Sequence, residues 1–139
     1  MPLPKLFRDR SRPAQVLLGG AVPAAIGALA GLMVGISAAG YWAIAALAAI
    51  GGILAGFEHR DGWGGADRGM VGGAIFAIAL VLIHDLTGKP AKVSLGSSSI
   101  VFVIFVTILS ILLGALGGRL ARAQRERAGI FITDEHLAE

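Results

Sequence analysis

The chain has 139 residues, of which 55% are hydrophobic, 15% are charged and 21 are glycine. This composition argues against a soluble domain and is typical of a helical bundle in lipid. The chain has no cysteine and only three scattered histidines, so we expect neither a bound metal nor a cofactor. We also expect no nucleic-acid partner, although the net charge is +3, because the basic residues flank apolar segments.

The first uncharged run covers residues 13–57. It is long enough for two crossings, since a helix needs about 20 mostly apolar residues to cross a bilayer. We expect helices at about 14–35 and 41–57, joined by a tight turn. Pro23 lacks a backbone donor, so it frees the carbonyl of Gly19 and kinks the first helix. A cleaved signal peptide is the alternative, but this apolar run exceeds the usual 7–15 residues.

Two further uncharged runs, 69–83 and 93–118, predict helices at about 69–86 and 97–118. A polar, glycine-rich loop over 58–68 precedes the third helix, and a basic extension follows the fourth. We therefore expect an all-α, integral membrane bundle of four transmembrane helices, with residues 1–139 forming one transmembrane domain in contact with the lipid bilayer.

The basic residues predict the orientation of this bundle. All of the 12 Lys and Arg except Lys89 and Lys92 lie in the N-terminal segment, the middle loop or the C-terminal segment. The positive-inside rule then places both termini in the cytoplasm, with the chain in the cell membrane.

Small residues recur every four positions in each predicted helix. Residues four apart share a helix face, and a strip of small residues lets two backbones approach closely. Packing within the chain is one interpretation, and self-association or contact with other membrane subunits is the other. The glycines expected at such contacts are Gly27, Gly31, Gly35, Gly52, Gly56, Gly73, Gly114 and Gly118.

The two halves of the chain resemble each other. Gly19-Gly20-Ala21 matches Gly72-Gly73-Ala74, and the small-residue strips of the second and fourth helices also match. These matches predict a parallel repeat of two helical hairpins. Chance matching in a Gly/Ala-rich sequence is the alternative.

Polar residues beside the membrane are the candidate pathway or mouth residues, because burying them in lipid is costly. We expect His84 and Asp85 at the outer mouth and Glu58 and Asp67 at the inner surface, unless all four are simply solvated. Thr107 and Ser110 are candidates to hydrate a pore, although such hydroxyls more often bond back to a helix carbonyl.

No predicted helix has a charged residue at its midpoint, and no catalytic triad, zinc motif or phosphate-binding loop is present. The protein is therefore not expected to be an enzyme. Two functions fit the sequence. The first is an oligomeric channel or transporter for a small solute or ion. The alternative is a non-catalytic accessory or assembly subunit of a larger membrane complex.

Overall fold

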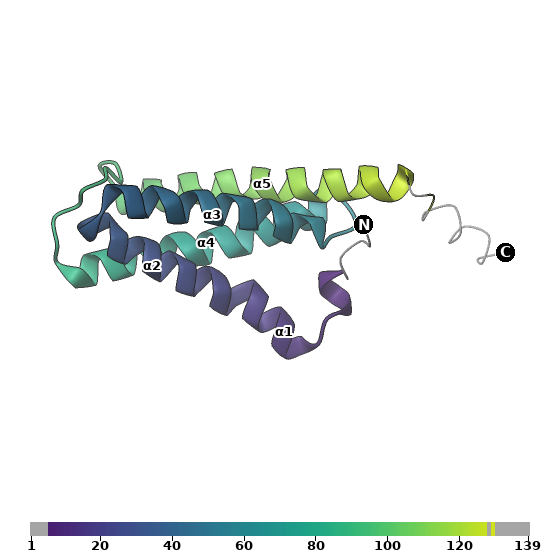
Figure 1. Ribbon diagram of the computed structural model, residues 1–139, viewed down its shortest axis with the longest axis horizontal. Coiled ribbons are helices and arrows are strands. Elements are labelled where there is room, and N and C mark those ends of the chain that lie inside the picture. The colour runs from purple at the N-terminus through teal and green to yellow at the C-terminus, as the bar shows by residue number, and fades with distance from the viewer. Residues whose placement is uncertain (1–5, 128, 130–139) are drawn as a thin grey trace.

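A computed structural model describes residues 6–127 and 129, and this part of the chain is helical without strands (Figure 1). After a short 3₁₀ turn (Phe7–Asp9), α1 (Arg12–Val16), a π-helical turn (Leu17–Ala21) and α2 (Val22–Ile36) form one continuous rod. The other three rods are α3 (Ala38–Phe57), α4 (Gly62–Thr87) and α5 (Ser99–Arg127). The tail beyond Arg127, apart from Gly129, lies outside the described residues.

The expected helices are present, and four rods in the described part are long and apolar enough to cross a membrane. Their bounds differ from the prediction at two turns and at the end of α5, which continues through the basic extension to Arg127. Ser37 alone separates α2 from α3, because its side chain accepts a hydrogen bond from the Gly40 amide at 3.1 Å and starts α3 at once.

The polar loop predicted over 58–68 is much shorter in the structure. Asp61 caps α4 by accepting a hydrogen bond from the Gly64 amide at 2.8 Å, so the helix already begins at Gly62. Gly62, Gly64 and Gly65, which were expected in this loop, instead lie inside a helix. Gly88, with φ of 60°, ends α4 in the left-handed conformation that glycine adopts without strain.

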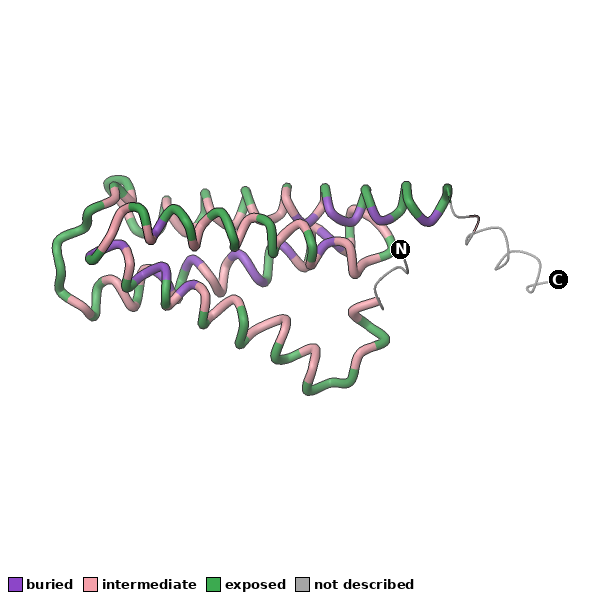
Figure 2. The backbone as a smooth tube through the Cα atoms, in the orientation of Figure 1, coloured by how far each residue is buried: buried purple, intermediate pink, exposed green. Residues whose placement is uncertain are grey.

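The rod α4 lies at the centre of the bundle and packs along both α2 and α5, while α3 lies against α5 and α2 (Figure 1). The buried core is formed by Ala30, Val34, Tyr41 and Leu80, near the turn between α2 and α3. In contrast, α1 and the π-helical turn contain no buried residue, and this part of the first rod diverges from α3 (Figure 2).

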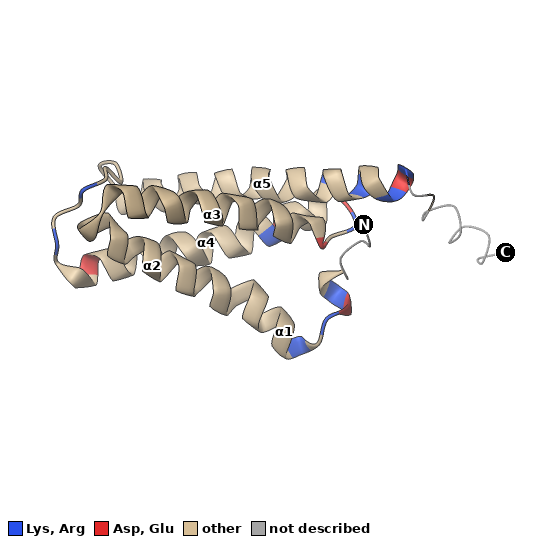
Figure 3. Cartoon of the chain, in the orientation of Figure 1, with Lys and Arg blue, Asp and Glu red and all other residues tan. Residues whose placement is uncertain are grey.

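In the described part of the chain, charged residues lie toward the two ends of the bundle (Figure 3). We call one the arginine end, where α1 and α4 begin and α3 and α5 end. The other is the lysine end, with Lys89, Lys92 and Asp85. At the lysine end the loop after α4 is fixed to α2, because Lys92 donates to the Val34 carbonyl through its amide and to the Ile36 carbonyl through Nζ, each at 2.8 Å.

Candidate functional site

A crevice of about 720 Å³ runs between the helices and is lined by residues of all four rods. Its wall on α3 extends from Tyr41 to Glu58, which corresponds to about 25 Å at 1.5 Å per helical residue. The volume lies within the range of about 300–1,000 Å³ that is usual for small-molecule sites. The crevice therefore has the length of most of the bundle and the volume of a binding site.

The middle of the crevice is apolar and lined by small residues. Ala48 and Gly52 of α3 and Gly73 of α4 line it together with Phe76 and Leu113. Small side chains at these positions leave the space between the rods unfilled. Gly52 illustrates this, because a Cβ built on it would meet only the Leu113 Cβ, at an ordinary 3.8 Å.

The lysine end of the crevice is formed by the loop before α5. Ser94, Ser97 and Ser98 line it beside Tyr41 and Trp42 of α3. Ser98 also starts α5, since its carbonyl accepts from the Phe102 amide at 3.0 Å. Serine residues thus line the crevice at this end, and the Ser94 and Ser98 hydroxyls accept from the nearby amides of Gly96 and Val101.

The arginine end of the crevice is formed by Glu58 and Arg68. Arg68 is half-buried on α4, and its guanidinium donates to the carbonyls of Leu18 and, at 3.5 Å, Gly19. A Cβ on Gly72 would lie 2.8 Å from Arg68 Nη1, so this glycine leaves room for the guanidinium.

Pro23 explains why these two carbonyls need Arg68. Gly19 would normally accept from residue 23, but proline has no N–H. The Val22 amide, which would normally serve Leu18, donates instead to the Leu17 carbonyl in the π-helical turn. Both adjacent carbonyls therefore lack their usual i+4 donor, and Arg68 supplies N–H groups to them.

The N-terminal segment closes over this end of the bundle. Arg10 Nη2 lies 2.6 Å from Glu58 Oε1, and the Phe7 amide donates to the Glu58 carbonyl at 2.9 Å. The Phe7 ring stacks on His59 at 5.7 Å and lies 5.4 Å from the Arg68 guanidinium carbon.

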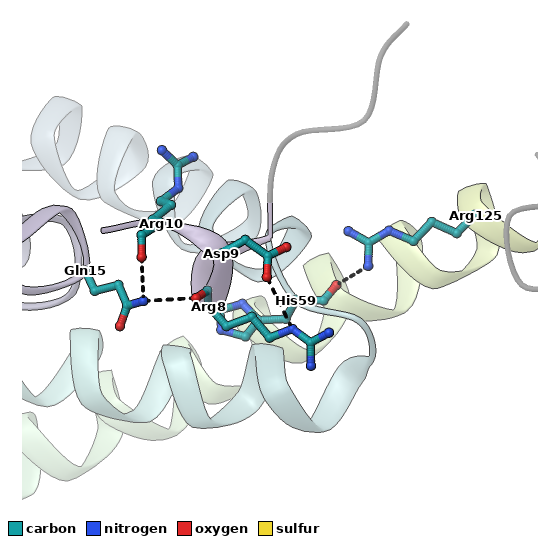
Figure 4. Close-up of polar contacts among 6 residues, drawn as sticks. All are labelled: Arg8, Asp9, Arg10, Gln15, His59 and Arg125. Carbon is teal, nitrogen blue, oxygen red and sulfur yellow. Dashed lines mark hydrogen bonds and ion pairs between the residues drawn. The ribbon is translucent and has the colours of Figure 1, made fainter. Parts of the chain in front are cut away.

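Gln15 holds the same segment from α1, since its side-chain amide donates to the carbonyls of Arg8 and Arg10 (Figure 4). On the opposite side, Arg125 of α5 donates to the His59 carbonyl at 3.2 Å (Figure 4). Through His59, contacts from the N-terminal segment and from α5 meet at the short turn between α3 and α4.

The candidate polar residues are distributed over different sites. Glu58 and Ser110 line the crevice, whereas Asp67 lines a second, open hollow of about 550 Å³ beside α1. Arg68 lines both cavities. Thr107 donates to the Val103 carbonyl at 2.7 Å, the back-bonded arrangement that is common for such hydroxyls. His84 and Asp85 lie at the lysine end of α4 but do not line the crevice, and serines occupy that mouth instead.

Most of the glycines expected at helix contacts lie against another backbone. Cβ atoms on Gly27 and Gly31 would collide with the Phe76 and Leu80 carbonyls of α4, and one on Gly56 would collide with Gly114 of α5. The remaining expected glycines also face neighbours: Gly35 meets Lys89, Gly73 meets Ser110, Gly114 meets Gly65, and Gly118 meets Asp61.

Gly52 is the exception among these glycines, because its Cβ would fit without displacing a backbone. It lines the crevice and does not allow a close helix contact. Two glycines on tight backbone contacts, Gly65 and Gly117, were not predicted from the sequence, and neither was the role of Arg68. The freed Gly19 carbonyl was the one sequence signal that pointed toward a donor such as Arg68.

Comparisons with protein families, curated proteins and solved structures find no match.

Proposed function

We propose that this protein spans the cell membrane and transports a small solute along the crevice between its four rods. The observation that carries the proposal is the crevice itself, which follows the bundle from the serines at the lysine end to Glu58 and Arg68 at the arginine end. A path that is polar at both ends and apolar between them suits a solute with apolar surface better than a bare ion, for which a dry apolar wall is a barrier.

The outer surface of the bundle supports the membrane part of this proposal. Large apolar side chains are exposed along every rod, among them Leu47 at 67%, Leu112 at 62% and Leu82 at 56%. Such a surface is unsuited to water and matches lipid. The confinement of arginines to one end favours a cytoplasmic location for that end and for both termini.

A monomer is sufficient for the proposed path. An excess of small-residue strips was the main reason to expect an oligomer, but the tight glycine contacts described above are made within the chain. Self-association then depends on larger apolar surfaces and is not required to form the crevice. The parallel hairpin repeat also stays a proposal. Its two matching glycines, Gly20 and Gly73, have unlike surroundings, since only Gly73 would collide with a neighbour.

The function is tested by flux into liposomes that contain the purified protein. Potassium, chloride, protons, glycerol and an alkyl sulfonate serve as probes. We expect transport of at least one probe, and Gly52→Leu should abolish it by filling the crevice. Ala46→Leu is the matched control, because Ala46 lies on the same rod, is exposed and does not line the crevice.

An accessory subunit of a larger membrane complex is the second candidate. Its supporting observation is the weak coverage of α3, in which Tyr41 and Gly56 are the buried residues and Trp42, Leu47 and Leu54 are at least 60% exposed. Absence of flux for every probe, together with purification of a larger complex from native membranes in mild detergent, would favour this function over transport.

A further inference from the structure

We infer that the crevice binds a free single-chain carboxylate amphiphile, with its carboxylate at Arg68 and its alkyl chain directed toward Trp42. This inference rests on the proposed function and names the class of its substrate. It follows from the charge at the arginine end, the shape of the crevice and the donors that Arg68 retains.

The arginine end of the crevice has an excess of positive charge. Glu58 is neutralised by Arg10, which lies 2.6 Å away. Arg68 forms no ion pair with a carboxylate among the described residues, since its partners there are two neutral carbonyls and the Phe7 ring. The one carboxylate in the described part of the chain that acts on Arg68 is Glu58, and it is shared with Arg10, so the pair of guanidinium groups keeps a net positive charge. A half-buried guanidinium with a shared counter-ion favours an anionic group on the ligand.

Arg68 also has donors available for that group. Its bond to the Gly19 carbonyl is long, at 3.5 Å, and its Nε has no protein acceptor in the described part of the chain. A guanidinium presents five N–H groups in a planar fork that matches a carboxylate. Arg68 can therefore hold the Leu18 carbonyl and a carboxylate at the same time.

The remainder of the crevice fits one alkyl chain. Beyond Arg68 the crevice is lined mainly by Ala, Gly, Val, Leu and Phe residues. Its volume of about 720 Å³ suits a drug-sized molecule. The proposed occupant is a free acid with one chain. A two-chain phospholipid is the competing occupant and is treated as an outcome of the test.

Trp42 provides a position-sensitive readout. The chain has two tryptophans, of which Trp42 lines the lysine end of the crevice and Trp63 is 82% exposed outside it. In a Trp63→Phe background, fluorescence reports on Trp42 alone. Hexadecanoate brominated at its methyl end is added to the protein in nanodiscs of neutral phosphatidylcholine. It should quench Trp42 more strongly than hexadecanoate brominated beside the carboxylate.

Matched probes and variants separate binding in the crevice from partition into lipid. Hexadecanol and hexadecyltrimethylammonium, brominated at the same methyl end, should quench only at higher concentration. Arg68→Gln, which retains a donor for the Leu18 carbonyl, should raise the half-saturating hexadecanoate concentration about ten-fold or more. Gly52→Leu should abolish saturable quenching and Ala46→Leu should not change it. If Arg68→Gln fails to fold, the loss of saturable quenching in Gly52→Leu still tests whether hexadecanoate binds in the crevice.

Equal quenching by the three head groups, or by the two bromine positions, would overturn the inference. So would a phospholipid that co-purifies with the protein and is not displaced by hexadecanoate. The proposed transport function is judged separately by flux. Flux of any probe without saturable hexadecanoate binding would leave the proposed transport standing and remove this ligand. Saturable hexadecanoate binding without flux of hexadecanoate itself or of any other probe would support the ligand and contradict transport.

Discussion

Gly65 of α4 and Gly114 of α5 each occupy the space that a side chain on the other would need. A Cβ added to Gly65 would collide with the Gly114 carbonyl oxygen, and one added to Gly114 would collide with the Gly65 carbonyl oxygen. Both obstacles are backbone atoms, which no side-chain rotation can move. Within lipid, where apolar burial does not drive helices together, this close approach of two backbones stabilises the pair.

We predict that Gly114→Ala lowers the free energy of unfolding in detergent by at least about 1–3 kcal/mol, the usual range for an overpacked contact. The matched control is Gly51→Ala. Gly51 lies in the middle of α3, and a Cβ there would meet nothing within 4 Å. Gly51→Ala should raise the free energy of unfolding by up to about 1 kcal/mol, since alanine has a higher helix propensity than glycine. Equal effects of the two substitutions on thermal unfolding would contradict the close contact between α4 and α5 at Gly114.

Two glycines with the same sequence signature should respond in opposite ways to leucine. Gly31→Leu should prevent folding, because a Cβ there already collides with the Leu80 carbonyl. Gly52→Leu should leave the melting temperature in detergent nearly unchanged, because the added side chain enters the crevice. Size-exclusion profiles and thermal unfolding of both variants check this. A folded Gly31→Leu protein would show that α2 and α4 are not in close contact.

Arg68 and Pro23 should be coupled in stability. Arg68→Met removes the donors for the Leu18 and Gly19 carbonyls and should lower stability by about 1–3 kcal/mol for each carbonyl left unsatisfied. Pro23→Ala restores an N–H to the first rod, so Arg68→Met should be less harmful in that background.

A double-mutant cycle by denaturant unfolding in detergent measures this coupling. Arg122→Met is the control, since Arg122 is exposed and pairs with Glu126 on its own helix. Strict additivity of Arg68→Met and Pro23→Ala would mean that the guanidinium does not replace the missing backbone donor.

The orientation of the bundle can be measured directly because the chain has no cysteine of its own. Ser11 and Ala91 are exposed at opposite ends of the bundle. In intact cells, a membrane-impermeant thiol reagent should label Ala91→Cys but not Ser11→Cys, and permeabilisation should expose both. Labelling of Ser11→Cys without permeabilisation would reverse the topology that the arginines predict.

The length and apolar composition of the uncharged runs were enough to predict the four rods, because these two properties determine whether a helix can cross a bilayer. They did not predict where α4 begins. The residues from Gly62 to Arg68 read as a flexible loop by composition, but Asp61 caps them and α5 packs against their glycines. Tertiary contacts thus overrode the local preference of glycine for turns.

The candidate site was harder to predict for a related reason. A strip of small residues does not reveal whether it faces a neighbouring backbone, as at Gly31, or an unfilled space, as at Gly52. From the sequence, Arg68 was counted only among the basic residues of the middle loop. Its partners, the Gly19 and Leu18 carbonyls, lie 49 and 50 residues away in the chain. Only the three-dimensional arrangement brings a guanidinium to the carbonyls that Pro23 leaves free.

The pairing of Pro23 with Arg68 has a consequence for biogenesis. The first rod is synthesised before α4 exists, so during that interval its Leu18 and Gly19 carbonyls lack both their usual i+4 donor and Arg68. Bare carbonyls are costly in hydrocarbon, so we expect this stretch to stay near the headgroups or near water until α4 is synthesised. We therefore expect release of the first hairpin into a bilayer to be coupled to synthesis of the second.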